Sequence, residues 1–323
     1  MEYRKPAHTD LKVSRLSFGT LTFGAEADEA TSLRMVGRCL EAGINFFDTA
    51  NVYNRGQSEL ILGKALAGRR HKVVIATKVR YPMGEGPDES GLSRLAIRKQ
   101  IDASLGRLGT DYVDIYYFHQ PDDDVRIEES LAAMDEAVRA GKVRYPAISN
   151  FAAWQICQMN WICQENGYRP YHISQPMYNV LARSIEDEYL AFCRRFGVAV
   201  VAYNPLAGGM LTGKHAGERR PSEGSRFHRD PWYLQQYWHS DYFAAVEELR
   251  AVARDAGKTL VELAFQWVLS QPVVDSIILG ASRLEQLEQN LKACEAGPLD
   301  EATLARCEAV WRRLRGVTPK YNR

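Results

Sequence analysis

Polar residues follow most of the short apolar runs of this chain, at the point where each run ends. The residues in these positions are Asp48, Lys78, His119, Ser149, Asn150, Gln175, Tyr203 and Asn204. If the apolar runs are parallel strands of a barrel, their carboxyl ends meet at one rim, where such enzymes do their chemistry. A carboxylate, an ammonium and an imidazole gathered there are suited to acid–base catalysis. The pattern therefore predicts a single catalytic site.

The elements that must position this site alternate regularly. About eight apolar runs suited to buried strands are separated by amphipathic helical stretches. The expected strands are Leu16–Gly19, Asn45–Asp48, Val73–Lys78, Tyr112–His119, Val143–Ser149, His172–Gln175, Val198–Tyr203 and Ser276–Gly280. The clearest expected helices are Ala30–Ala42, Leu92–Leu108, Ile127–Ala140 and Ala152–Glu165. Glycines that can end helices stand before several strands, at Gly43, Gly109, Gly141 and Gly197.

Eight strand–helix units in 323 residues favour a closed barrel over an open doubly wound sheet. No glycine-rich fingerprint follows the first strand, which also favours the barrel. We predict an α/β protein with one (β/α)8 TIM barrel domain over residues 1–323, a β-hairpin at Glu2–Val13 and a long irregular loop at Ala207–Ser240. Pro146 falls inside the fifth strand, removes a hydrogen-bond donor there and predicts a local bulge.

Composition narrows the class of protein. Apolar residues make up 46% of the chain, enough for a sizeable core. The net charge of +1 gives no electrostatic reason to expect nucleic acid or a membrane as partner. The amino terminus has no apolar signal segment, and no stretch has the roughly 20 apolar residues of a membrane helix. Six scattered cysteines without a C-x-x-C pair indicate a reduced, cytoplasmic protein.

Several segments, in order and at barrel spacing, resemble the aldo-keto reductase superfamily along nearly the whole chain. They are Gly43–Tyr53, Ala76–Lys78, Phe118–Asp122, Gly141–Arg144, Ser149–Phe151, Tyr203–Gly209 and Gly280–Gln286. The resemblance implies an NADP(H)-dependent oxidoreductase that reduces aldehydes or ketones, with a small carbonyl compound as substrate. Neither the substrate nor the oligomeric state can be identified from the sequence.

The resemblance also implies a catalytic tetrad of Asp48, Tyr53, Lys78 and His119. Tyr53 would protonate the carbonyl oxygen as hydride arrives at carbon. A free phenol has a pKa near 10, and a neighbouring Lys78 ammonium would lower it. Asp48 would keep Lys78 charged and aimed, and His119 would hydrogen-bond the substrate oxygen.

Cofactor-binding residues follow from the same resemblance. Ser149 and Asn150, with Gln175 beside them, match the pair that contacts the nicotinamide carboxamide, and Tyr203 matches the aromatic residue that stacks on the ring. The predicted contacts to pyrophosphate, adenine and the 2′-phosphate are Leu206, Gly208, Lys214, Gly280, Ser282, Arg283, Gln286 and Asn290. A helix amino terminus together with Arg283 suits a phosphate, which favours NADPH, although Arg283 also fits a solvated surface charge.

Four positions depart from the family pattern. Asn51 and Asn54 flank the predicted acid where relatives often have Asp and Gly, Asn204 stands where serine is frequent, and Pro146 interrupts the fifth strand. None belongs to the tetrad, so they bear on the substrate and local geometry rather than on the reaction class.

Three other functions remain open from the sequence. A nucleotide-binding partner subunit of the potassium channel β type would share the barrel and show little turnover. A Schiff-base aldolase would need a neutral Lys78, which Asp48 opposes. Metal-dependent hydrolysis lacks a recognisable ligand cluster in the sequence, so no metal is expected.

Overall fold

The computed structural model describes residues 1–215, 220–317 and 319, so residues 216–219 of the predicted long loop lie outside the described residues. The chain divides into two compact units. The first comprises Met1–Pro176, Glu188–Val201 and Asp275–Leu287, and the second Met177–Asp187, Ala202–Val274 and Glu288–Arg323.

Eight parallel strands close into a barrel, which confirms the predicted fold class. They are β3 (Leu16–Gly19), β4 (Phe46–Asp48), β5 (Val74–Val79), β6 (Val113–Phe118), β7 (Val143–Ser149), β8 (Ile173–Gln175), β9 (Ala199–Ala202) and β10 (Val274–Gly280). Strands β4, β5 and β6 are buried along their whole length, as expected for strands covered by side chains on one face and helices on the other. Asp48, Lys78, Ser149 and Gln175 lie at the carboxyl ends of β4, β5, β7 and β8, and His119 directly follows β6.

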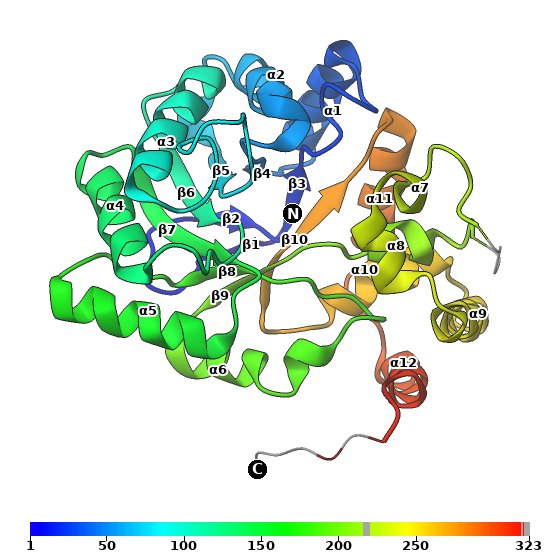
Figure 1. Ribbon diagram of the computed structural model, residues 1–323. Helices are drawn as coiled ribbons and strands as arrows, with labels where there is room; N and C mark the ends of the chain where they lie inside the picture. Colours follow the sequence, from blue (N-terminus) through cyan, green and yellow to red (C-terminus); the bar gives the residue numbers. More distant parts are fainter. Residues whose placement is uncertain (216–219, 318, 320–323) are drawn as a thin grey trace. The chain divides into compact units, whose positions relative to one another are not determined.

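Helices of the first unit lie outside the strands (Figure 1). They are α1 (Glu29–Glu41), α2 (Gln57–Ala65), α3 (Arg94–Leu108), α4 (Ile127–Arg139), α5 (Ala153–Asn166) and α6 (Tyr189–Phe196), with the short 3-10 helices η1 (Tyr53–Gly56) and η2 (Arg70–Lys72). Asp28 and Ser93 cap α1 and α3 through their side chains. Gly109 and Gly197 end α3 and α6 in the left-handed conformation, as predicted.

The second unit is mainly helical. Its elements are η3 (Ser184–Glu186), η4 (Ala207–Thr212), α7 (Arg226–Arg229), α8 (Pro231–Tyr237), α9 (Ser240–Asp255), α10 (Leu260–Leu269) and α12 (Glu301–Arg315), while α11 (Leu284–Glu295) begins in the first unit. Among the described residues, no helix combines the length and the apolar content needed to cross a membrane.

Two details of the prediction concern loops. The amino-terminal hairpin is present, with β1 (Tyr3–Arg4) antiparallel to β2 (Val13–Ser14). The segment Ala207–Ser240 was predicted to be irregular, and this is wrong for its described residues, which contain η4, α7 and α8. Asp230 accepts from the backbone of Trp232 and Tyr233, and Pro231 occupies the first turn of α8. This Asp-Pro pair is a helix-start signal that the sequence contained.

The bulge predicted at Pro146 is wrong. Strand β7 pairs with β6 at the same offset at Val143 and from Tyr145 to Ile148, with Tyr116 opposite Pro146, so no extra residue is inserted. Strand β8 pairs with β7 at Ile148 and Ser149, beyond the proline. At Pro146 one edge of β7 therefore has no strand to bond, and the missing N–H is accommodated without a bulge.

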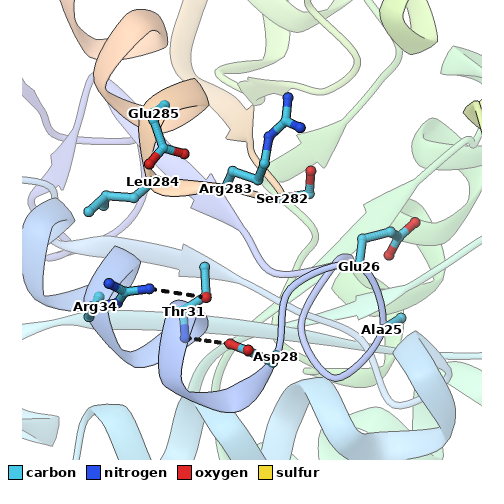
Figure 2. A pocket seen from close by; sticks show the side chains of 9 residues that line it. All are labelled: Ala25, Glu26, Asp28, Thr31, Arg34, Ser282, Arg283, Leu284 and Glu285. Carbon is cyan, nitrogen blue, oxygen red and sulfur yellow. Dashed lines mark hydrogen bonds between the residues drawn. The ribbon is translucent and has the colours of Figure 1, made fainter.

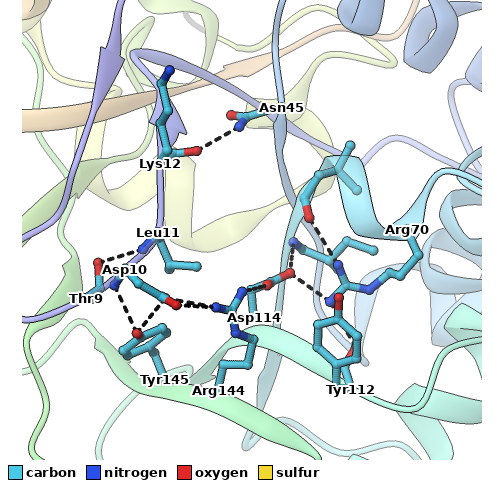
Figure 3. A network of polar contacts seen from close by, with 12 residues as sticks. Thr9, Asp10, Leu11, Lys12, Asn45, Arg70, Tyr112, Asp114, Arg144 and Tyr145 are labelled. Atoms are coloured by element: carbon cyan, nitrogen blue, oxygen red, sulfur yellow. Dashed lines mark hydrogen bonds and ion pairs between the residues drawn. The ribbon is translucent and has the colours of Figure 1, made fainter.

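A buried carboxylate organises the amino-terminal end of the barrel (Figure 3). Asp114 is 1% exposed and accepts from the backbone N–H of Ile75 at 2.9 Å and from Arg144 Nη1 at 2.8 Å. Its other ion pair is to Arg70, at 2.7 Å. Arg144 also reaches Asp10, in the loop before β2. Both oxygens of Asp114 are thus compensated, and strands β5, β6 and β7 are joined through one side chain.

We expect Asp114→Ala to destabilise the protein by about 3 kcal/mol, because it leaves the buried N–H of Ile75 and two partly buried arginines without this partner. Asp102 provides the control, since it pairs with Lys142 on the surface with both side chains exposed. Asp102→Ala should cost less than about 1 kcal/mol. Urea unfolding followed by circular dichroism measures both, and equal losses would show that Asp114 has no special structural role.

Candidate active site

The site is built around Lys78, whose side chain is completely buried at the end of β5. Its ammonium forms an ion pair with Asp48, at the end of β4, and donates to the carbonyl oxygen of Thr49 at 2.8 Å. It also donates to the Tyr53 hydroxyl at 3.4 Å. Strands β4 and β5 are neighbours in register, with Asp48 opposite Ala76, so the barrel itself brings the carboxylate and the ammonium together.

Opposing effects act on the charge of Lys78. Burial lowers the pKa of its ammonium, while Asp48 raises it through charge and hydrogen bonding. Glu59 adds a smaller attraction of the same sign. With a carboxylate in direct contact and two oxygen acceptors, we describe Lys78 as an ammonium bonded to Asp48.

Tyr53 stands at the start of the short turn that connects β4 to α2. Its ring is half-buried, with the Lys78 ammonium 5.0 Å from the ring centroid. The next three residues all have left-handed backbones, with φ of 49° at Asn54, 55° at Arg55 and 85° at Gly56. Such a run is uncommon for residues with a side chain, and it reverses the chain directly after the tyrosine.

His119 follows the last residue of β6 and faces two tyrosines. Its ring meets the ring of Tyr53 edge-on at a centroid distance of 6.0 Å, and that of Tyr81 at 4.8 Å. Its Nδ1 atom is buried and has no hydrogen-bond partner among the described residues. Burial, and then the charge of Lys78, holds the pKa of this imidazole well below its usual 6.5. The ring is therefore neutral at neutral pH.

Three of the predicted cofactor-binding residues are linked to this group. Gln175 Nε2 donates to Asp48 Oδ2 at 2.8 Å. Ser149 donates to the carbonyl oxygen of Gln175 at 2.8 Å, and Asn150 Nδ2 donates to the carbonyl oxygen of His119 at 2.9 Å. Hydrogen bonds thus connect the ends of β7 and β8 to those of β4 and β6. The bond from Gln175 holds the Asp48 carboxylate in position.

Sequence reasoning missed a second buried acid beside the site. Glu59, on α2, is fully buried, accepts from the Thr77 hydroxyl at 2.6 Å and pairs with Arg107 of α3 at 2.6 Å. Thr77 is next to Lys78 in β5, so the Glu59–Arg107 pair is bonded to the residue that precedes Lys78. Its signal in the sequence was a glutamate among the apolar residues of α2, within the short stretch Ser58–Leu62.

A pocket of about 280 Å³ lies between the loop before α1 and the start of α11 (Figure 2). Ser282 and Arg283 line one side, and Ala25, Glu26 and Asp28 line another. Leu284, where α11 begins, also lines it, and the amides of a first helical turn have no partner within their helix. Arg283 and the amides of the first turn of α11 suit an anion, while Glu26, Asp28 and Glu285 place carboxylates in the same lining.

The other predicted residues of this region lie on β10 and α11, outside the lining of this pocket. Gln286 accepts from both the backbone and the hydroxyl of Ser282, at 2.9 and 3.0 Å, which fixes the turn that carries Arg283. Gly280 is the last residue of β10. Asn290 is buried further along α11, in the part that belongs to the second unit.

The other predicted cofactor residues belong to the second unit and are described within it. Tyr203 forms an isolated bridge with Met177, and Asn204 accepts from the backbone N–H of Gly208 at 2.5 Å. Gly208 has φ of 67°, and a Cβ there would lie 2.7 Å from the Tyr233 ring, so a side chain would not fit. Leu206 is half-buried at the start of η4, and Lys214 is exposed.

Comparison with known proteins agrees with the barrel fold. The model of the Aldo/keto reductase family matches residues 15–312. This chain belongs to the aldo/keto reductase family. It is therefore an oxidoreductase of the aldo/keto reductase type, in a family whose members generally use NADH or NADPH.

Relatives of this aldo/keto reductase carry different names. It is 36% identical over 335 residues to the uncharacterized oxidoreductase YrpG of Bacillus subtilis, covering 99% of each chain. It is 37% identical to a probable voltage-gated potassium channel subunit beta of Arabidopsis thaliana, covering 93% of each. It is 35% identical to aflatoxin B1 aldehyde reductase member 2 of Homo sapiens, covering 94% of this chain and 88% of the relative.

The low pKa of His119 has a testable consequence. Because its pKa is lowered from 6.5 in the folded protein, neutral His119 contributes stability above that pH, and the contribution is lost as the pH falls towards the folded value.

Replacing Lys78 by Met and Asp48 by Asn together removes the nearby cation without leaving a buried carboxylate. We expect the pKa of His119 to rise but stay below 6.5, because burial remains. Imidazole ¹⁵N NMR across pH measures it; an unchanged pKa would show that the imidazole does not respond to Lys78.

Proposed function

We propose that this protein is an NADPH-dependent carbonyl reductase in which Tyr53 is the general acid of an Asp48–Tyr53–Lys78–His119 tetrad. The observation that carries the proposal is the Lys78 ammonium, which is bonded to Asp48 and donates to the Tyr53 hydroxyl at 3.4 Å. A buried ammonium in that position stabilises negative charge on the phenol oxygen. The substrate class is a small aldehyde or ketone.

The proposed proton transfer follows from the contacts that run from Gln175 through Asp48 and Lys78 to Tyr53. A nicotinamide, when bound, would supply hydride to the carbonyl carbon, which would leave negative charge on the carbonyl oxygen. Tyr53 gives its proton to that oxygen, and Lys78 stabilises the phenolate that remains. Asp48, itself held by Gln175, keeps the ammonium in place. Neutral His119 can donate one hydrogen bond to the carbonyl oxygen and hold it near Tyr53.

The donor set fits the nucleotide as well as the substrate. Ser149, Asn150 and Gln175 offer a hydroxyl and two amides close to the tetrad, the groups that recognise a carboxamide. Ser282 and Arg283, at the start of α11, would hold the adenosine 2′-phosphate. Tyr203, Leu206, Gly208, Lys214, Gly280, Gln286 and Asn290 complete the proposed set of nucleotide contacts.

Tyr53→Phe should lower the rate of NADPH oxidation at 340 nm by about 10²-fold or more, since it removes the proton donor. Nucleotide affinity, measured by fluorescence titration, should change little. Tyr116→Phe is the matched control: its hydroxyl is fully buried and has no hydrogen-bond partner in the described structure. A Tyr53→Phe enzyme as fast as wild type would eliminate Tyr53 as the acid.

Arg283→Ala should weaken NADPH binding about tenfold or more and NADH binding much less, because a charge-assisted bond to the 2′-phosphate is lost. Arg98→Ala removes an exposed arginine from α3 and controls for the change in net charge. Equal weakening of NADPH and NADH by Arg283→Ala would mean that the 2′-phosphate binds elsewhere.

The second candidate is a nucleotide-binding partner subunit, favoured by the similarity to a probable potassium channel subunit beta. The same assays separate the two. Tight NADPH binding without turnover on any aldehyde or ketone of a broad panel would support the partner subunit. Turnover that depends on Tyr53 supports the reductase.

A further inference from the structure

Asn54, one of the departures from the family pattern, makes contacts that a glycine could not. Its Nδ2 group donates to two backbone carbonyls of the loop between β3 and α1, Leu21 at 2.8 Å and Phe23 at 2.7 Å. Both hydrogens of one amide are therefore used. A glycine at this position has no donor, and an aspartate would place a carboxylate against two carbonyl oxygens.

The loop that Asn54 contacts, residues 20–28, is a closed and well-anchored unit. The N–H groups of Ala25 and Ala27 both donate to the Thr22 carbonyl, and Phe23 is fully buried. At its base, the N–H of Thr20 donates to the Asp48 carbonyl at 2.9 Å. These bonds close the loop on itself and tie its base to the end of β4.

The far side of this loop meets the pocket in which we place the nucleotide phosphate. The Thr22 hydroxyl donates to the carbonyl of Ala281 at 2.6 Å, and this bond is buried. Ser282 and Arg283 follow directly, and they share the pocket with Ala25 and Glu26 of the loop (Figure 2). One loop therefore contacts the phosphate pocket at one side and the Tyr53 turn at the other.

We propose that loop 20–28 links the nucleotide pocket to the catalytic acid, and that Asn54 is the positioning residue that completes the link. Binding of an adenosine 2′-phosphate beside Arg283 further restrains the loop, through the shared pocket and the Thr22–Ala281 bond. The loop then holds the turn after Tyr53 through its two bonds to Asn54. Energy from a remote part of the nucleotide is used in this way to position Tyr53. The inference rests on the proposed function, because it assumes the phosphate site.

Backbone strain makes the turn dependent on that link. Asn54 and Arg55 hold left-handed backbones, at φ of 49° and 55°, a conformation that is unfavourable for residues with a Cβ atom. Asparagine tolerates this conformation better than most residues, and its side-chain bonds offset part of the cost. Without those bonds the turn has less to hold it, and Tyr53 is its first residue.

Two neighbouring glycine substitutions separate the link from the strain. Asn54→Gly relieves the backbone strain and removes both bonds to the loop. Arg55→Gly relieves the same kind of strain at an exposed residue and leaves both bonds intact. Asn54→Asp serves as a second variant, because it loses the donors while keeping a residue that accepts a left-handed backbone. Urea unfolding first establishes that all three fold.

Hydrogen–deuterium exchange with adenosine 2′,5′-bisphosphate tests the link without any turnover. In wild type and Arg55→Gly, we expect the ligand to slow amide exchange about threefold or more at residues 281–287, 20–28 and 51–57. In both Asn54 variants the slowing should reach 20–28 and be lost at 51–57. Slowing at 51–57 that is equal in wild type and the Asn54 variants would overturn the link, as would slowing confined to 281–287 in wild type.

Kinetics provides the second readout and separates the two proposals. Asn54→Gly should lower kcat with NADPH about tenfold with little change in the KM for NADPH, while Arg55→Gly stays near wild type. Variants that both match wild type would overturn the positioning role. No effect of the bisphosphate at residues 281–287 would instead contradict the proposed phosphate site, and no turnover in wild type would contradict the proposed reductase.

Discussion

The buried positive charge of Lys78 is the constraint on which the rest of the site depends. A fully buried ammonium is tolerated in a folded protein when charged and polar partners replace the water that it loses. Asp48, the Thr49 carbonyl and the Tyr53 hydroxyl supply them. Each partner is fixed in turn: Asp48 by strand register and by Gln175, and Tyr53 by the turn that follows it. The need to solvate one ammonium thereby determines where the proposed acid stands.

Buried carboxylates recur at both ends of the barrel, and each is paired differently. Asp48 meets an ammonium at the carboxyl end of the strands, and Glu59 meets Arg107 just behind it. Asp114, at the opposite end, is shared by two arginines and a backbone amide. In Glu59 and Asp114, both carboxylate oxygens have a hydrogen-bond or ion-pair partner, which suits a structural role. The Asp48–Lys78 pair extends to the hydroxyl of Tyr53, the proposed acid.

Much of this arrangement could be predicted from the sequence, for a physical reason. Strand ends are marked by the change from apolar to polar residues, so Asp48, Lys78 and His119 stood out before any contact was known. Side-chain pairing between distant segments leaves no such local mark, and for that reason Glu59 with Arg107 was missed. Pro146 failed as a bulge signal because whether a missing N–H matters depends on where the neighbouring strand begins. Helices within Ala207–Ser240 were missed although Asp230 and Pro231 carry a start signal.

The neutral state of His119 depends first on burial and then on the charge of Lys78. Lys78 is held as a cation by its contact with Asp48, and its charge helps keep the neighbouring imidazole unprotonated. If His119 were protonated instead, two cations would face Tyr53, and the site proposed for a neutral carbonyl would carry an uncompensated charge. With His119 neutral, Lys78 is the cation beside Tyr53, and Asp48 balances its charge. The ammonium then acts on the phenol oxygen to which it donates. The same features are required of a site that stabilises an oxygen anion for the duration of one proton transfer.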